Sequence, residues 1–147
     1  MLHSRTTCCA LALAVIWFRL ASASAASNDG FKIAVNPQNP VTAIDRDFLR
    51  TAFLKQTIRW RNGEALRRVG LAGESPARDR FIQEVMKKTP SQLKNYWLQR
   101  IFSGVDVPPP EVASPAAAIA YVLANRGGLT YLPIDVDPGG AKIIKIQ

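Results

Sequence analysis

The chain has 147 residues, a formal net charge of +8, 48% apolar residues and 20% charged residues. This length suits one domain and excludes long architectures such as an eight-stranded α/β barrel. The apolar and charged fractions are those of a globular protein, so they exclude disorder along the whole chain.

The N-terminal segment has the pattern of a secretory signal peptide. A short stretch with Arg5 precedes an unbroken apolar run over residues 8–18, and small residues follow at 21–26. This order of basic, apolar and small residues is typical of an export signal. The run is shorter than the roughly 20 residues that span a bilayer. We therefore predict a signal peptide over residues 1–25, a mature domain over 26–147 and a periplasmic or secreted protein. An uncleaved amphipathic start is the alternative.

Cleavage near Ala25 would change the chemistry available to the domain. His3, Cys8 and Cys9 all lie in the predicted signal, so the mature chain has no histidine and no cysteine. It then lacks a thiol nucleophile, a histidine base and a Cys/His zinc site. We accordingly expect a non-enzymatic protein with no catalytic residue, no metal and no cofactor. Two arginines leave with the signal, which lowers the net charge to +6.

Positive charge is concentrated in the middle of the chain. Residues 50–100 hold 12 Lys and Arg against four acidic residues, whereas residues 26–49 and 101–147 each have a net charge of −1. A basic region attracts phosphate-like solutes, acidic lipid headgroups or acidic proteins. No basic motif interleaved with aromatic residues is present, so we do not expect nucleic acid as a partner. A solvated basic face is the alternative.

The first half of the domain alternates a strand, a helix and a strand. Apolar residues alternate over residues 31–35, which predicts a strand, and a turn-rich loop follows at 36–40. A helical stripe runs over 44–53, preceded by the possible caps Thr42 and Asp45. Asn62-Gly63 marks a turn before a second strand over residues 66–71.

Three further helices begin with a hydroxyl residue followed by proline. Ser75-Pro76, Thr89-Pro90 and Ser114-Pro115 each suit an N-cap and first helical position. Their apolar faces comprise Phe81, Ile82, Val85 and Met86; Leu93, Trp97 and Ile101; and Ile119, Val122 and Leu123. Tyr96 and Phe102 are expected in the core with Met86 and Trp97. Strands over 129–134 and 141–146 complete the order β-α-β-α-α-α-β-β, which predicts an α/β fold with a mixed sheet flanked by helices.

The start of the first proline-led helix is the candidate anion site. Free backbone N–H groups and the positive helix end suit an anion, and the Ser75 hydroxyl and Arg78 guanidinium add donors. We therefore name Ser75, Ala77 and Arg78 as candidate anion-binding residues. Ordinary helix capping, with Arg78 on a solvated face, is the alternative. Glu74 adds a negative charge beside the site.

The ordered motifs resemble a known family over most of the chain. They are residues 35–41 (VNPQNPV), 49–55 (LRTAFLK), Trp60 with Asn62-Gly63, 75–81 (SPARDRF), 90–97 (PSQLKNYW), 101–104 (IFSG), Pro108-Pro109 and 127–131 (GGLTY). Together they resemble the short, exported, single-domain relatives of the periplasmic phosphate-binding protein of phosphate ABC transporters. This resemblance implies a single lobe of a periplasmic-binding-protein type II-like fold.

The resemblance also implies where a ligand would bind. In two-lobed members of the family, a Ser-Gly-Thr at a helix N-terminus and an upstream arginine hold phosphate. Here Ser75 matches the serine, Pro76 and Ala77 stand at the glycine and threonine positions, and Leu71 stands at the arginine position. Only one lobe's half of a cleft is present unless two chains pair.

Two functions follow from these observations. The first is binding of phosphate or a related oxyanion at the Ser75 helix, by a protein related to the substrate-binding component of an ABC transporter. The second is an envelope interaction module that kept the fold, lost the ligand and binds a protein partner or a second copy of itself.

Overall fold

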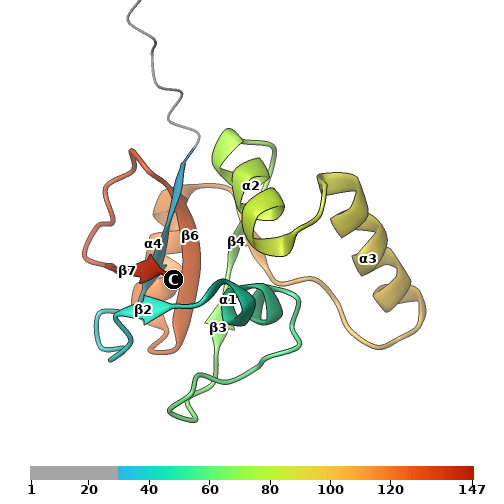
Figure 1. The fold of residues 1–147 in the computed structure, drawn as a ribbon. Helices are drawn as coiled ribbons and strands as arrows, with labels where there is room; N and C mark the ends of the chain where they lie inside the picture. The colour runs from blue at the N-terminus through green and yellow to red at the C-terminus, as the bar shows by residue number, and fades with distance from the viewer. Residues whose placement is uncertain (1–29) are drawn as a thin grey trace, which may run out of the picture.

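A mixed five-stranded sheet forms the centre of the domain (Figure 1). The computed structural model describes residues 30–147, and the predicted signal over 1–25 lies outside them. In the order β2-β7-β1-β6-β3, the strands are β2 (Ala43–Ile44), β7 (Lys142–Ile146), β1 (Phe31–Val35), β6 (Gly128–Pro133) and β3 (Arg67–Arg68). β1 is antiparallel to both neighbours, whereas β2 is parallel to β7 and β3 is parallel to β6. The predicted α/β class with a mixed sheet is confirmed.

Helices cover both faces of the central strands. Tyr131 of β6 stacks on Phe81 of α2 (Pro76–Phe81), with ring centroids 4.1 Å apart. On the opposite face, a Cβ added to Gly128 would lie 2.8 Å from the backbone of Val122, so α4 (Pro115–Ala124) packs directly on the strand there. Burial on both faces explains why β6 is enclosed along almost its whole length instead of alternating buried and exposed residues.

The predicted helix starts are confirmed at all three proline-led helices. Side-chain oxygens of Ser75, Thr89 and Ser114 each accept the backbone N–H three residues later, at 3.2 Å. Gln92 completes a capping box with Thr89 at the start of α3 (Pro90–Phe102). The earlier helix, α1 (Arg46–Phe53), begins at Asp45, whose carboxylate accepts the N–H of Phe48 at 2.6 Å.

The single strand predicted over residues 66–71 is instead divided at Val69. The N–H of Val69 still donates to Leu129 of β6 at 3.0 Å, but the next N–H, of Gly70, donates to Pro110 at 2.9 Å. The chain therefore changes partners at this point. It forms β4 (Gly70–Leu71), which pairs in parallel with β5 (Glu111–Val112) in a separate two-stranded sheet. Neither β2 nor β5 was predicted, because two-residue strands leave no periodic pattern.

The second half of the first proline-led helix departs from α-helical geometry. Residues Ile82–Met86 continue α2 as a π-helical segment, η1. Lys87 then closes the segment in the left-handed conformation at φ +54°. The predicted apolar face is nevertheless confirmed, since Phe81, Ile82, Val85 and Met86 are all buried.

Helix α3 extends away from the sheet, and the predicted burial fails at its C-terminal end (Figure 1). Trp97 is its one buried residue among 13, whereas Ile101 is 45% and Phe102 is 86% exposed. Helical spacing alone placed both residues in the core, but within residues 30–147 this end of the helix is exposed. Leu123 of α4 is likewise exposed, contrary to the predicted apolar face. No helix within residues 30–147 is long and apolar enough to cross a membrane.

Candidate functional site

The candidate site begins at the turn that leads from β4 into α2. Gly73 adopts φ +81°, a conformation that side chains rarely tolerate, and this turn carries Glu74 to the surface. Ser75 has an extended backbone, and Pro76 occupies the first helical position. The Ser75 oxygen caps the helix by accepting the N–H of Arg78. Capping leaves the hydroxyl proton available as a donor.

Arg78 is held in place by two acceptors at the inner side of this turn. Its Nε donates to the carbonyl of Leu71 at 3.1 Å, and its Nη2 lies 3.1 Å from Oε1 of Glu111 on β5. The pairing of β4 with β5 places Glu111 opposite Gly70, next to Leu71, so that both acceptors lie within reach of Arg78. The two contacts fix the orientation of the Arg78 guanidinium, which already binds one carboxylate.

Tyr131 forms the floor beside Arg78. Its ring lies parallel to that of Phe81, and its hydroxyl oxygen accepts the backbone N–H of Leu71 at 3.3 Å. Burial raises the pKa of the Tyr131 phenol above its ordinary value, and the hydrogen bond from Leu71 opposes this shift. The phenol therefore remains neutral at physiological pH.

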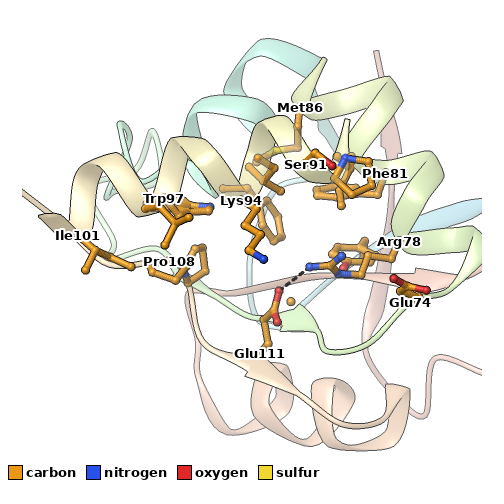
Figure 2. Close-up of a pocket in the computed structure, with 18 residues that line it drawn as sticks. Glu74, Arg78, Phe81, Met86, Ser91, Lys94, Trp97, Ile101, Pro108 and Glu111 are labelled. Atoms are coloured by element: carbon orange, nitrogen blue, oxygen red, sulfur yellow. Dashed lines mark hydrogen bonds and ion pairs between the residues drawn. The ribbon is translucent and has the colours of Figure 1, made fainter. Parts of the chain in front are cut away.

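These residues line one end of a pocket of about 670 Å³ between α2, α3 and the segment that precedes β5 (Figure 2). Most of the lining is apolar: Phe53, Phe81, Ile82, Met86, Leu93, Trp97, Leu98, Ile101, Pro108 and Pro109. The charged lining residues are Glu74, Arg78, Lys94 and Glu111. In Figure 2 the Lys94 ammonium points toward the Arg78–Glu111 pair, and Trp97, Ile101 and Pro108 lie at the other end.

The three residues named from the sequence do not share one position. Arg78 lines the pocket, Ser75 caps the helix next to it, and the side chain of Ala77 is buried under the helix. Arg78 is only partly exposed and ion-paired, and so is not on a solvated face. Sequence reasoning missed Glu111 and Lys94. Glu111 follows three prolines in a stretch without periodicity, so no sequence signal points to its contact with Arg78.

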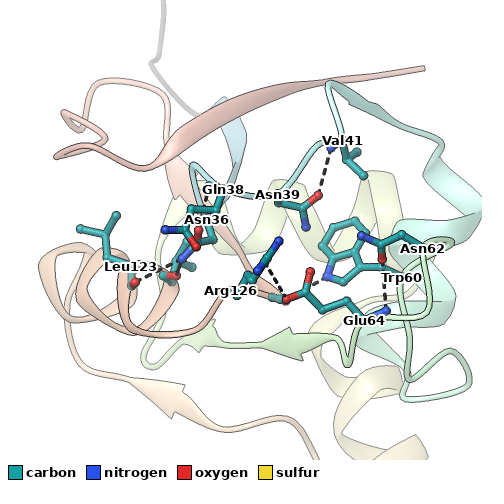
Figure 3. Close-up of polar contacts among 11 residues, drawn as sticks. Asn36, Gln38, Asn39, Val41, Trp60, Asn62, Glu64, Leu123 and Arg126 are labelled. Atoms are coloured by element: carbon teal, nitrogen blue, oxygen red, sulfur yellow. Dashed lines mark hydrogen bonds and ion pairs between the residues drawn. The ribbon is translucent and has the colours of Figure 1, made fainter.

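A second group of polar contacts stabilises the loop after β1 (Figure 3). The Asn36 amide donates to the carbonyls of Val122 and Leu123 at 3.0 and 3.1 Å, while its oxygen accepts the N–H of Gln38. The indole of Trp60 donates to the carbonyl of Gly127 at 3.0 Å. These contacts connect the loop, α4 and the start of β6, so their role is structural.

Part of the positive charge in the middle of the chain is neutralised by ion pairs. Arg50, Arg61 and Arg80 pair with Asp47, Asp45 and Glu84. Arg68 is buried and donates to the Thr57 carbonyl at 2.8 Å. Burial lowers the pKa of its guanidinium below the ordinary value. Within residues 30–147 no cluster of three or more His, Cys, Asp or Glu could hold a metal ion.

Comparisons with solved structures identify proteins of the same fold. An ABC-type phosphate transport receptor from Vibrio cholerae aligns with a TM-score of 0.62 at 23% identity, over 80% of this chain and 46% of its own. A putative phosphate ABC transporter substrate-binding protein with bound phosphate, from Clostridium perfringens, aligns with a TM-score of 0.61 at 16% identity, over 80% and 44%. PstS from Borrelia burgdorferi aligns with a TM-score of 0.61 at 10% identity, over 80% and 47%.

The likeness concerns the fold of one lobe. This chain spans less than half the length of the three proteins it aligns with. No protein-family model matches the sequence, and no curated protein matches it significantly. The resemblance to phosphate-binding proteins that the sequence motifs indicated is confirmed at the level of the fold.

Proposed function

We propose that this chain is an exported, non-enzymatic binding module that holds a small oxyanion, such as phosphate, at Arg78 beside the start of α2. The contact between Arg78 and Glu111 carries the proposal, because a guanidinium fixed against one carboxylate has the geometry to bind another oxyanion. The fold shared with a phosphate transport receptor and with a putative phosphate transporter substrate-binding protein that holds phosphate supports it.

Ser75 and Ala77 complete the proposed site. The Ser75 hydroxyl keeps its proton as a donor after capping the helix. The backbone N–H of Ala77 belongs to the first turn, where helical geometry supplies no intrahelical acceptor. Glu111 is paired with the Arg78 guanidinium in the free protein, so a bound oxyanion would displace the Glu111 carboxylate. Competition of this kind predicts weak affinity for phosphate in the native chain.

Calorimetric titration with phosphate tests the proposal through two substitutions. Glu111→Gln removes the competing charge, so we expect it to tighten phosphate binding at least tenfold. Ser75→Asp keeps a good helix cap but adds a negative charge, and we expect it to abolish binding. Ser114→Asp is the matched control, since Ser114-Pro115 caps α4 in the same way and does not line the pocket. If millimolar phosphate neither releases heat nor raises the melting temperature of wild type or Glu111→Gln, the proposal is wrong.

Export is tested separately from ligand binding. The protein, expressed with its own N-terminus in a Gram-negative host, is expected in the periplasmic fraction, with a mass that corresponds to cleavage after Ala23, Ala25 or Ala26. An uncleaved chain in the cytoplasmic fraction would contradict this part of the proposal.

Exposed apolar residues after α3 favour partner binding as the second candidate. Phe102, Val105 and Val107 are 86%, 62% and 57% exposed and follow one another closely in the chain. Apolar residues gathered on a surface often mark a protein contact. Sedimentation of the purified protein tests for a second copy, and crosslinking in envelope extracts tests for another partner. Either contact should be lost in Phe102→Asp. If the Phe102→Asp variant kept every contact, this surface would be excluded as the partner-binding site.

A further inference from the structure

The pocket beside Arg78 is larger and more apolar than an inorganic oxyanion requires. Its volume of about 670 Å³ falls within the roughly 300–1,000 Å³ typical of sites for organic ligands. A tetrahedral ion at Arg78 would contact only the charged end. Most of the remaining wall is carbon, from the rings of Phe81 and Trp97 to the prolines at 108 and 109.

The apolar wall comes from two elements that face each other across the pocket. Leu93, Trp97 and Ile101 recur every four residues along α3 and so lie on one side of the helix. Pro108 and Pro109, in the segment that precedes β5, form the opposite wall (Figure 2). The Lys55 ammonium fixes this segment by binding Asp106 at 2.8 Å and the carbonyl of Val107 at 3.0 Å. Apolar side chains are thus exposed on both walls of a defined groove.

The charged end contains a second cation. Figure 2 shows the Lys94 ammonium directed toward Glu111, and no hydrogen bond or ion pair joins the Lys94 side chain to another of the residues 30–147. Arg78 and Lys94 therefore flank the same space from α2 and α3, with one carboxylate, Glu111, between them. Glu74 also lines the pocket, and in Figure 2 it lies on the other side of Arg78 from Lys94. An anion that displaced Glu111 would meet both cations at once.

From this arrangement we infer that the ligand is an organic oxyanion. It is an organic phosphate or carboxylate that carries a flat or branched apolar group. This inference rests on the proposed function and specifies its substrate class. The oxyanion binds Arg78 and Lys94, and the apolar group lies along Trp97 and Ile101 against the prolines. Binding the apolar group removes carbon surface from water on both partners, which inorganic phosphate cannot do.

Calorimetry with a matched set of ligands tests the inference. The probes are inorganic phosphate, 1-naphthyl phosphate, 1-naphthoate and the neutral 1-naphthalenemethanol. We expect 1-naphthyl phosphate to bind at least tenfold more tightly than inorganic phosphate, and the neutral alcohol to bind at least tenfold more weakly than either naphthyl anion. The comparison of naphthyl phosphate with naphthoate shows which oxyanion the charged end prefers.

Two pairs of variants locate the contacts. Ile101→Asp should remove the advantage of 1-naphthyl phosphate without changing the affinity for inorganic phosphate. Phe102→Asp is its control, because Phe102 is the next residue on α3 but does not line the pocket. Lys94→Glu should weaken both phosphates at least fivefold, whereas Lys145→Glu, with the same charge change on β7, should weaken neither. Circular dichroism and melting temperature verify that each variant is folded.

The outcomes separate the inference from the proposed function. Equal affinity for inorganic and naphthyl phosphate would overturn the inference and leave the proposed oxyanion site intact. Binding of naphthyl phosphate without measurable binding of inorganic phosphate would support the inference and contradict phosphate as the native ligand. Equal losses in Ile101→Asp and Phe102→Asp would overturn the assignment of the apolar group to this pocket. No binding of any anion would overturn both.

Discussion

Strand β6 and helix α3 illustrate two ways in which this chain uses apolar residues. β6 is enclosed on both faces, and Leu129 and Leu132 have no exposed surface. α3 has 13 residues against six in β6, yet Trp97 alone is buried, and its remaining apolar residues face the pocket or solvent. The same residue types therefore stabilise the fold in one region and shape a surface in the other.

The difference assigns separate roles to the two regions. The sheet with α1, α2 and α4 supplies the fixed parts of the candidate site, namely Arg78, Phe81 and Tyr131. α3 and the proline segment supply Lys94, Trp97 and Ile101 from outside that core. Surface substitutions on α3 should alter ligand preference with little loss of stability. Substitutions in the sheet should lower stability with little effect on ligand preference.

The largest expected contrast comes from truncating one leucine in each region. Leu129→Ala creates a cavity in the core and should lower the free energy of unfolding by about 2–5 kcal/mol. Leu98→Ala on α3 truncates a side chain that is 39% exposed, and we expect a smaller loss of about 1 kcal/mol or less. Urea denaturation measures both. Losses of equal size would mean that α3 is part of the core after all.

A second contrast compares two glycines. A Cβ at Gly127 would lie 1.9 Å from the Ala65 carbonyl oxygen, so Gly127→Ala must push two backbone segments apart and should cost about 1–3 kcal/mol. Gly104, after α3, has φ +67° and open space around it, so Gly104→Asn should be nearly neutral, because asparagine tolerates that conformation. Thermal unfolding distinguishes them. A stable Gly127→Ala variant would show that this close approach can relax.

The N-caps of α4 and α3 should show the same difference between the sheet region and α3, with a smaller effect on stability. Removing an N-cap costs roughly 1 kcal/mol. Ser114→Ala should produce that loss in global stability, because α4 packs on the sheet. Thr89→Ala should instead act locally: amide exchange should accelerate over residues 90–102 while the global free energy of unfolding changes little. Hydrogen exchange followed by mass spectrometry checks this, and uniform acceleration across the sheet in Thr89→Ala would contradict it.

The smallest expected effect concerns the link between the two regions. The hydrogen bond from Lys55, followed by that from the Val107 N–H, holds the pKa of the Asp106 carboxyl below its ordinary value of 3.8. A lowered pKa in the folded state means that the carboxylate stabilises the fold above pH 3.8 and that this contribution disappears as the pH falls through the lower value.

Asp106→Asn tests the direction of this pH dependence of stability. The stability difference between wild type and variant should be largest near neutral pH and should vanish in acid, as measured by urea midpoints from pH 7 down to pH 2.5. Asp135→Asn, at an exposed site, is the control. A difference that grows in acid would contradict the assignment.

Local chemistry made much of the fold predictable. The strand over residues 31–35 and the three hydroxyl-proline helix starts follow from short-range patterns, and all are present. The break at Val69 did not follow, because it depends on which distant segment offers the next hydrogen bond. The π-helical segment after α2 did not follow either, because its apolar spacing is the same as that of an α-helical face. Helical periodicity could identify the apolar side of α3 but not whether anything covers it.

The candidate site was predictable only in part. Arg78 was found because it follows a capped helix start, and it does line the pocket. Its partner Glu111 is 33 residues away and reaches it through the pairing of two-residue strands, which carry no sequence signal. Lys94 looked like any exposed lysine on a helix, and its direction toward the pocket depends on how α3 crosses the molecule.

The position of β7 has a consequence for how the chain folds. β1 and β2 are separated by only seven residues, yet they do not pair, because β7 lies between them. Ile33 of β1 instead pairs with Tyr131 of β6 on one side and with Ile144 of β7 on the other. Each of these pairings spans about 100 residues and closes a long loop of chain, and proteins dominated by such contacts fold in milliseconds to seconds. The helix caps join residues three apart in the chain and can form early, whereas both pairings of β1 require the closure of long loops.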